Sequence, residues 1–397
     1  MKEVSINDNI TYPADSKTPT AFFLLAAVGI IASATGYFML GEDKAQFFFS
    51  YLTSFTFVAS IALGALFFVM LQHVTRSKWS VALRRIPEVL SANTWVLLLL
   101  FIPVFYGMHD LFHWTHEEAV ATDPILLAKE PYLNIPFYLI RNVIFFAIWG
   151  FLGWKLFQVS KRMDENQNWG EQTLLRKISA PGIPIFAFTV AFASFDWLMS
   201  LDPHWFSTMW GVYYFAMSFQ VFFPIVILIV MYLWKKGLVT ESITMKHLGD
   251  AGKLLFGFTV FYAYIAFSQY LLIYYANIPE ETLWFYHRFE GDWVYIAWLL
   301  LLGRFVLPFI VLLSKSAKSN IKVLKWLSVW LIAVHFIELY WIVMPTLHTH
   351  HTSFHWLDIA TLLGLGGLFM GLFFNTLKKQ SLIPTSDPHL NESLDNH

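Results

Sequence analysis

Five ionisable residues lie inside long apolar stretches of the chain: Arg141, Asp196, Arg304, His335 and Glu338. A charge inside a bilayer is costly, so such residues usually face the protein interior or a water-filled path. Burial favours the neutral form of a carboxyl group and a nearby arginine favours its charged form, so a site with both can exchange protons near neutral pH. We therefore predict that these five residues form a proton path. The alternative is that the arginines and acids form buried structural ion pairs, and the two interpretations are compatible.

Helical spacing places more polar side chains beside these five. His335 and Glu338 are three residues apart and therefore share a helix face. Similar polar or small stripes occur on three other segments, at Thr189, Ala193, Asp196 and Ser200, at Tyr213, Met217 and Gln220, and at Tyr262, Ala266 and Gln269. Four helices would then line a hydrogen-bonded path or a pocket for a quinone head group. We predict two proton relays, Glu338 with His335 and Asp196 with His204.

A second candidate site lies in the loops that follow these segments. Asp202, Pro203 and His204 form a turn, because proline disfavours helix at the preceding residue and cannot continue a helix itself. His109 and Asp110 fall in a loop on the same predicted side of the membrane. These residues, with neighbouring aromatic rings, are the alternative place for a quinone. The histidine-rich run 348–355 has no interleaved carboxylate at ligand spacing, so we predict no metal site.

Composition indicates a polytopic membrane protein. The 397 residues are 57% hydrophobic and 13% charged, with a mean hydropathy of +0.55, whereas soluble domains are about 25% charged. The net charge of −1 argues against a nucleic-acid partner. There are no cysteines, which excludes disulfides, thiolate-bound iron–sulfur clusters and covalently attached c-type haem in this chain. Haem b needs a histidine pair inside the bilayer, and only His335 lies there.

Apolar segments long enough to span a bilayer predict an all-α protein with ten transmembrane helices. Lysine and arginine gather in the loops of one side, and the opposite loops hold only Lys44, Lys129 and Arg288. By the positive-inside rule both termini are cytoplasmic. The predicted spans are 20–40, 47–72, 92–108, 136–157, 182–200, 208–234, 254–276, 293–313, 323–344 and 357–377.

An internal repeat appears when spans 2–5 are laid over spans 6–9. Asp196 lies seven residues before Pro203, and Glu338 lies seven residues before Pro345. The third helix of each set carries an arginine, Arg141 or Arg304. We therefore predict one membrane domain, 19–378, with two four-helix units at about 46–200 and 208–344 and with spans 1 and 10 peripheral. Segments 1–18 and 379–397 are polar and are predicted to be cytoplasmic tails, the second one disordered.

Three long runs of sequence indicate a family: FDWLMSLDPHW at 195–205, FSQYLLIYYANIPEE at 267–281 and YLNIPFYLIR at 132–141. They resemble the F subunit of bacterial alternative complex III, which is similar to the NrfD/polysulfide-reductase membrane subunits. The resemblance covers 20–377 and implies two four-helix bundles, spans 2–5 and 6–9.

The resemblance also implies a quinol-oxidising respiratory complex that passes electrons to cytochrome c or a terminal oxidase. The implied partners are a homologous NrfD-like membrane subunit, a periplasmic iron–sulfur protein, multihaem and monohaem cytochromes c, small membrane subunits and, where one joins, a terminal oxidase. Iron–sulfur clusters and c-type haems would then belong to those partners, and quinone or quinol is the one cofactor this chain could contact.

We expect an integral subunit of the bacterial cytoplasmic membrane that handles protons or couples quinol oxidation to proton movement. Its proton path would use Asp196, His335, Glu338, Arg304 and Arg141. Two alternatives remain open. The chain could bind quinol in an outer-leaflet pocket of its own, shaped by His109, Asp110, Asp202 and His204, or it could be a structural anchor for periplasmic redox subunits. A secondary transporter is disfavoured, because no pair of Gly/Pro breaks indicates discontinuous binding helices.

Overall fold

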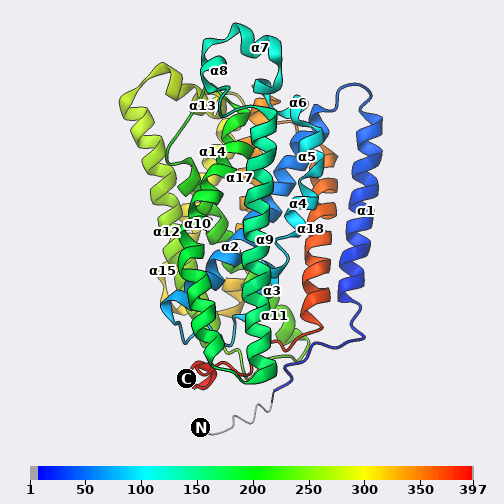
Figure 1. Ribbon diagram of the computed structural model, residues 1–397. Coiled ribbons are helices and arrows are strands. Elements are labelled where there is room, and N and C mark those ends of the chain that lie inside the picture. Colours follow the sequence, from blue (N-terminus) through cyan, green and yellow to red (C-terminus); the bar gives the residue numbers. More distant parts are fainter. Residues whose placement is uncertain (1–7, 396–397) are drawn as a thin grey trace.

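The computed structural model describes residues 8–395, and this part of the chain is helical, with one isolated β-bridge between Thr11 and Ser381 and no strand. Long helices stand upright side by side (Figure 1). The elements are α1 (Thr18–Met39), α2 (Ala45–Thr75), α3 (Arg85–Ala92), α4 (Val96–Leu100), α5 (Ile102–Tyr106), α6 (Met108–Leu111), η1 (His113–Thr115), α7 (Glu117–Thr122), α8 (Pro124–Lys129), α9 (Ile135–Asn166), α10 (Gly170–Trp197), η2 (Met199–Leu201), α11 (Trp210–Lys235), α12 (Met245–Ala276), α13 (Pro279–Phe289), α14 (Trp293–Leu300), η3 (Leu301–Val306), α15 (Leu307–Leu313), α16 (Lys315–Lys318), α17 (Ile321–Val343), η4 (Met344–Thr346), α18 (Trp356–Leu377) and α19 (Leu390–Leu394).

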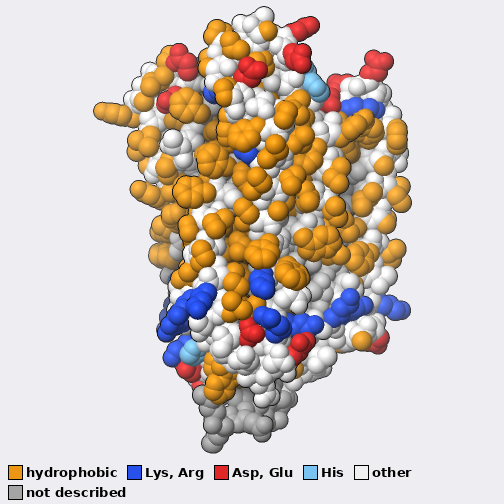
Figure 2. All heavy atoms as spheres, in the orientation of Figure 1, with side chains coloured by type: hydrophobic (Ala, Val, Ile, Leu, Met, Phe, Trp, Pro, Cys, Tyr) orange, Lys and Arg blue, Asp and Glu red, His pale blue; other side chains and the backbone are white. Residues whose placement is uncertain are grey.

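Within residues 8–395, nine helices are long and apolar enough to cross a membrane, or ten if one bent helix pair counts as a span. On the face that Figure 2 shows, apolar side chains cover the middle of the molecule, and Lys and Arg gather near the end at which the ribbon of Figure 1 begins and ends. Exposed large apolar side chains occur on most of the long helices. A surface with so wide an apolar band suits contact with lipid rather than with water. The architecture therefore indicates a multi-pass membrane protein.

The third predicted span, 92–108, is not a single helix. Short helices α4, α5 and α6 occupy this region. The axis bends by 46° between α3 (Arg85–Ala92), which ends at the first residue of the predicted span, and Val96–Tyr106. Pro103 has no N–H to donate, and the backbone N–H of Gly107 bonds to the Pro103 carbonyl where α5 ends. The predicted count of ten spans is reached when this bent pair is counted as one span, and that span consists of short helices instead of one continuous helix.

Helix α2 is the centre of the molecule. In its most apolar stretch 89% of the residues are buried, against 22% of those in α1 and 28% of those in α12. It packs against α10 and α3 on one side and against α11, α17 and α18 elsewhere, and α11 in turn packs against α12 and α17. Polar groups on α2 can therefore reach residues of several other helices.

Helices α1 and α18 form a close pair beside this core, and they lie next to one another in Figure 1. Their backbones nearly touch, because a Cβ placed on Gly29 would lie 2.2 Å from the backbone nitrogen of Gly364. Glycine at both positions removes the side chains that would hold the helices apart. The pair joins the core mainly through α18, whose Thr361 shares a hydrogen bond of 2.8 Å with Ser54 of α2.

The C-terminal segment, predicted to be disordered from residue 379 onward, is ordered as far as residue 395. Leu382, Ile383 and Leu390 are buried. Asp387 accepts a hydrogen bond of 2.5 Å from Arg84 next to α3. Hydrophobic anchors and a buried ion pair thus hold a segment whose overall polarity suggested disorder. Residues 1–7 and 396–397 of the predicted tails lie outside the described residues.

Candidate functional site

The five intramembrane ionisable residues form two separate clusters. The first, here called the Asp196 cluster, consists of Asp196 and Trp197 on α10, Arg141 and Asn142 on α9, and Tyr132 just before α9. Arg141 binds the carboxylate with two nitrogens, at 3.1 Å and 2.9 Å. Both side chains are buried. A bidentate arginine–carboxylate pair is among the stronger and more rigid polar contacts in proteins.

Neighbouring groups complete the hydrogen bonding of Asp196. The Tyr132 hydroxyl donates to Oδ1 at 3.0 Å, and the Asn142 amide donates to Oδ2 at 3.4 Å. The Arg141 guanidinium also stacks on the Tyr132 ring at 3.8 Å and bonds to the Tyr132 carbonyl at 2.8 Å. Trp197 fixes Asn142 through a bond of 2.6 Å. Tyr132 is partly exposed, so it is the group of this cluster nearest to solvent.

The second cluster, here called the Glu338 cluster, is buried deeper and draws residues from five helical elements. Glu338 on α17 forms an ion pair with Arg304 on η3 and accepts a hydrogen bond from Tyr213 on α11. Tyr262 on α12 donates to the same carboxylate oxygen at 2.5 Å. The guanidinium lies over the Tyr262 ring at 4.5 Å. Ser60 on α2, Gln220 on α11 and His335 on α17 complete the cluster through the bonds described next.

Arg304 is the hub of the Glu338 cluster. It donates to Gln220 Oε1 at 3.0 Å and to His335 Nδ1 at 2.9 Å. Because His335 Nδ1 accepts, its Nε2 carries the proton and donates to Ser60 Oγ at 2.8 Å. His335 is therefore neutral, and Arg304 lies between it and Glu338. Arginine does not release its proton, so this contact is no direct relay between His335 and the acid. The predicted relay therefore needs a water or a side-chain movement.

The backbone around Arg304 is a π-helix, Leu301–Val306, inserted between α14 and α15. A π turn adds one residue to a helical turn and is often found at functional sites. Here it turns the guanidinium toward the protein interior, where Arg304 is 1% exposed, although Leu301 and Leu302 beside it are exposed. Trp330 holds the turn through a bond of 2.7 Å from its indole nitrogen to the Gly303 carbonyl.

A cavity of about 530 Å³ adjoins the Glu338 cluster and is here called the Glu338 cavity. Its polar wall consists of Glu338, Tyr213, Tyr262 and Gln269, and its other walls are apolar and largely aromatic. Two lining residues, Phe267 and Trp298, are 59% and 57% exposed on the lateral surface of the molecule. The cavity therefore reaches from the apolar surface between α12 and α14 to a buried carboxylate.

Among the four predicted outer-face residues, His204 contacts an acid other than Asp196. His204 bonds to Asp123 at 2.5 Å, and this bond, more than any other contact, holds the pKa of the partly exposed Asp123 carboxyl below its ordinary value. Asp196 instead contacts Arg141, Tyr132 and Asn142, so no direct hydrogen bond joins it to His204. The predicted relay between these two residues would also need a water or an intervening group.

The remaining outer-face residues lie apart from the two clusters. His109 contacts Thr115 at 3.2 Å. The pKa of Asp110 is raised, mainly by partial burial and to a smaller extent by the negative charge of nearby Asp43. The Glu338 cavity is lined by none of His109, Asp110, Asp202 and His204.

The histidine-rich run before α18 has structural contacts. His348 bonds to Gln46 at 2.9 Å, and the His355 side chain accepts from the backbone N–H of Leu357 at the start of α18. His351 lies 3.5 Å from Asp292. These histidines point to different partners, and the described residues contain no group of three or more His, Asp or Glu arranged for a metal ion.

Sequence reasoning found the charged members of both clusters and placed Tyr213, Gln220 and Tyr262 on inward stripes. It missed Tyr132, Asn142 and Ser60. Asn142 directly follows Arg141 in an apolar helix, and that neighbour relation was a usable signal. Tyr132 and Ser60 carried none, because a tyrosine near a membrane boundary and a serine in a membrane helix are both common there.

No protein-family model matches the chain, and no curated protein sequence is similar to it.

Proposed function

We propose that this chain is the proton-handling membrane subunit of a respiratory quinol-oxidising complex, like the F subunit of alternative complex III. The observation that supports this proposal is Glu338, a fully buried carboxylate that faces a cavity on one side and an arginine on the other. An acid in that position can exchange a proton with a molecule in the cavity. Its change of charge alters the electrostatic interaction with Arg304 and, through Arg304, with the groups bound to that guanidinium.

The chemistry follows from the hydrogen bonds. In the charged state Glu338 accepts from two tyrosine hydroxyls and is paired with Arg304. When the carboxylate takes up a proton, Arg304 loses its counter-charge and retains only neutral acceptors such as Gln220 and His335. Buried charges interact strongly because little water screens them. Protonation would therefore favour a rearrangement of η3 and α17, which couples proton uptake to conformation.

The finer architecture belongs to the same proposal. Helices α2, α3–α6, α9 and α10 would form the first four-helix bundle, and α11, α12, α14–α15 and α17 the second, with α1 and α18 peripheral. The Asp196 and Glu338 clusters would then occupy equivalent places in the two bundles, each an arginine of the third helix paired with an acid of the fourth. The basic end that carries both termini would face the bacterial cytoplasm.

In this proposal the electron carriers belong to partners. A homologous membrane subunit, a periplasmic iron–sulfur protein, c-type cytochromes and, where present, a terminal oxidase would carry electrons from quinol. The cysteine-free composition agrees with a chain that holds none of those centres itself.

The test is substitution of the acids in the intact complex. Glu338→Gln and Asp196→Asn keep the shape of each side chain but remove its proton-exchanging group. General acid–base groups typically contribute about 10²–10⁴-fold to rate, so quinol-dependent turnover or the proton-to-electron ratio should fall strongly in at least one variant. Glu280→Gln, at an exposed position, is the matched control. Unchanged turnover and unchanged proton coupling in both buried variants would overturn the proposal.

A second candidate, quinol binding by this chain, is favoured by the Glu338 cavity itself. A quinol has a flat apolar body and hydroxyl protons, which match aromatic walls and an acid beside two tyrosines. Such a ligand could enter from lipid past Phe267 and Trp298. Gln269, Tyr262 and Glu338 would hold its polar head. On oxidation to quinone, the quinol would give two electrons to a redox centre of a partner subunit and two protons to acceptors that lead to the aqueous side, Glu338 being the first.

Photolabelling separates this candidate from the first. A photoreactive quinone should label residues of α12 or α14, and Ala266→Trp should abolish that label by filling the cavity. Leu271→Trp, on the exposed face of the same helix and outside the cavity lining, should not. Labelling confined to a partner subunit would rule out a quinol site here and would leave the proton-handling proposal intact.

A further inference from the structure

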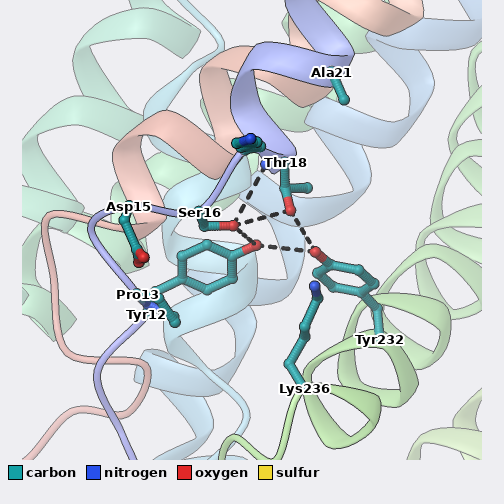
Figure 3. A pocket seen from close by; sticks show the side chains of 9 residues that line it. Tyr12, Pro13, Asp15, Ser16, Thr18, Ala21, Tyr232 and Lys236 are labelled. Carbon is teal, nitrogen blue, oxygen red and sulfur yellow. Dashed lines mark hydrogen bonds between the residues drawn. The ribbon is translucent and has the colours of Figure 1, made fainter.

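A second hollow, here called the basal cavity, lies at the end of the molecule that carries both termini (Figure 3). It has a volume of about 620 Å³ and lies between the segment that leads into α1 and the last turn of α11. Phe374 of α18 packs behind it, with ring centroids 5.4 Å from both Phe22 and Tyr232. Three membrane helices therefore meet at this hollow, at the boundary between the apolar band and the basic end.

Hydroxyl groups form the wall of the basal cavity. The Thr18 hydroxyl lies 2.5 Å from the Tyr232 hydroxyl, and the Tyr12 hydroxyl lies 3.1 Å from that same oxygen. Ser16 bonds to Tyr12 at 3.3 Å and contacts Thr18 at 3.1 Å. The four side chains converge on one point in Figure 3. A linked set of hydroxyls can reorient its protons together toward an acceptor.

Two cations line the same hollow. Lys17 and Lys236 are both exposed, and the structure pairs neither with a carboxylate within residues 8–395. Asp15 also lines the cavity, but Figure 3 places it on the other side of the Tyr12 ring from Lys236. Lys17 precedes α1 without a side-chain cap, so the positive end of that helix also faces this region.

We propose that the basal cavity binds the phosphate of an anionic phospholipid from the adjacent leaflet. Two lysines and a hydroxyl network supply charge and hydrogen-bond donors, and phosphate is the headgroup element that needs both. Basic pockets between membrane helices are known to hold lipid head groups. Directly beyond the cavity, α1 exposes Leu24, Leu25 and Val28, against which acyl chains can lie. A soluble phosphate compound would make no use of that apolar surface.

The proposal does not depend on the proton-handling function, so the two can fail separately. The test uses the full chain in detergent micelles, with phosphatidylglycerol titrated as the probe and thermal unfolding and native mass spectrometry as readouts. Each lysine near an anionic lipid contributes about five-fold to affinity, so Lys17→Gln with Lys236→Gln should weaken phosphatidylglycerol binding roughly 30-fold. Tyr232→Phe should weaken it roughly two- to ten-fold, because it removes one hydroxyl and keeps the ring.

A matched control distinguishes a built site from general attraction. Lys177→Gln with Lys235→Gln removes the same charge from two exposed positions outside the basal cavity and should leave phosphatidylglycerol binding unchanged. An equal loss in this control, or no loss when Lys17 and Lys236 are replaced, would overturn the proposal. Inorganic phosphate should neither stabilise the chain nor compete. If it does both at low concentration, the ligand is a soluble phosphate and the lipid assignment is wrong.

Discussion

We expect substitution within the Glu338 cluster to lower the free energy of unfolding by a measurable amount. Glu338→Gln keeps an acceptor for Tyr213 and Tyr262 but leaves the buried Arg304 guanidinium without a counter-charge. Removing one partner of a buried ion pair typically costs about 3–5 kcal/mol. Arg304 keeps neutral acceptors at 3.0 Å and 2.9 Å, so we expect a loss near the lower end of that range.

The assay is equilibrium unfolding in mixed micelles, followed by tryptophan fluorescence and analysed as a double-mutant cycle. Arg304→Gln alone should cost less than Glu338→Gln, because the carboxyl group left behind can become neutral by taking up a proton. The variant with both substitutions should be more stable than the sum of the single losses predicts, by about 1–3 kcal/mol. The exposed Glu280→Gln should change stability by less than about 0.5 kcal/mol. A cost for Glu338→Gln no larger than that of this control, or additive single losses, would refute the view that these residues form a coupled buried pair.

Three other contacts should respond measurably to substitution or to pH. Tyr132→Phe removes one hydrogen bond to Asp196 and should cost about 1 kcal/mol in unfolding free energy. No loss at all would show that the ring stacked on Arg141, which phenylalanine keeps, and not the hydroxyl, is what matters. Burial alone would raise the pKa of Asp387, but the Arg84 guanidinium outweighs burial and holds that pKa below 3.8. The stabilising effect of the Asp387–Arg84 pair is therefore complete above about pH 4 and is lost as the pH falls through the lowered pKa. Hydrogen exchange of the C-terminal segment should show earlier opening in acid, and Asp387→Asn should abolish this pH dependence. Gly29→Leu would add a Cβ only 2.2 Å from the backbone of α18, so α1 should separate from α18 and become accessible to protease. The matched replacement at Gly366, where a Cβ would meet open space, should be tolerated.

The sequence predicted the helical class and the charged residues of the site well, for one physical reason. Charges are so costly in apolar segments that Arg141, Asp196, Arg304 and Glu338 had to find partners, and the spacing on each helix limited which partners were within reach. The two ion pairs seen in the structure follow directly from that constraint. Hydropathy located the long helices for the same reason, since length and composition alone decide whether a segment can span a bilayer.

The sequence did not predict features that depend on which helix packs where. The break between α3 and α4, and the division of residues 96–111 into three short helices, were not predicted, because hydropathy does not register how neighbouring helices constrain the backbone. The π turn that carries Arg304 cannot be predicted from the spacing of apolar residues in this segment. The contact between Asp387 and Arg84 joins residues about 300 positions apart, and the polarity of a local segment does not predict contacts over such separations.

The pairing of α1 with α18 has a consequence for how the protein is made. α1 is the first of the described spans to leave the ribosome, and its main packing partner follows about 340 residues later, which at ordinary rates of synthesis is roughly 20 to 70 seconds. During that interval α1 cannot rely on its final neighbour and must be stable in lipid by its own composition. Its mean hydropathy of 1.9 lies within the range of 1.5 to 2.4 found for the described spans, so its composition meets that requirement. Assembly of the bundle is therefore completed only when the last span arrives, and a truncated nascent chain would leave the glycine-lined face of α1 open in the membrane.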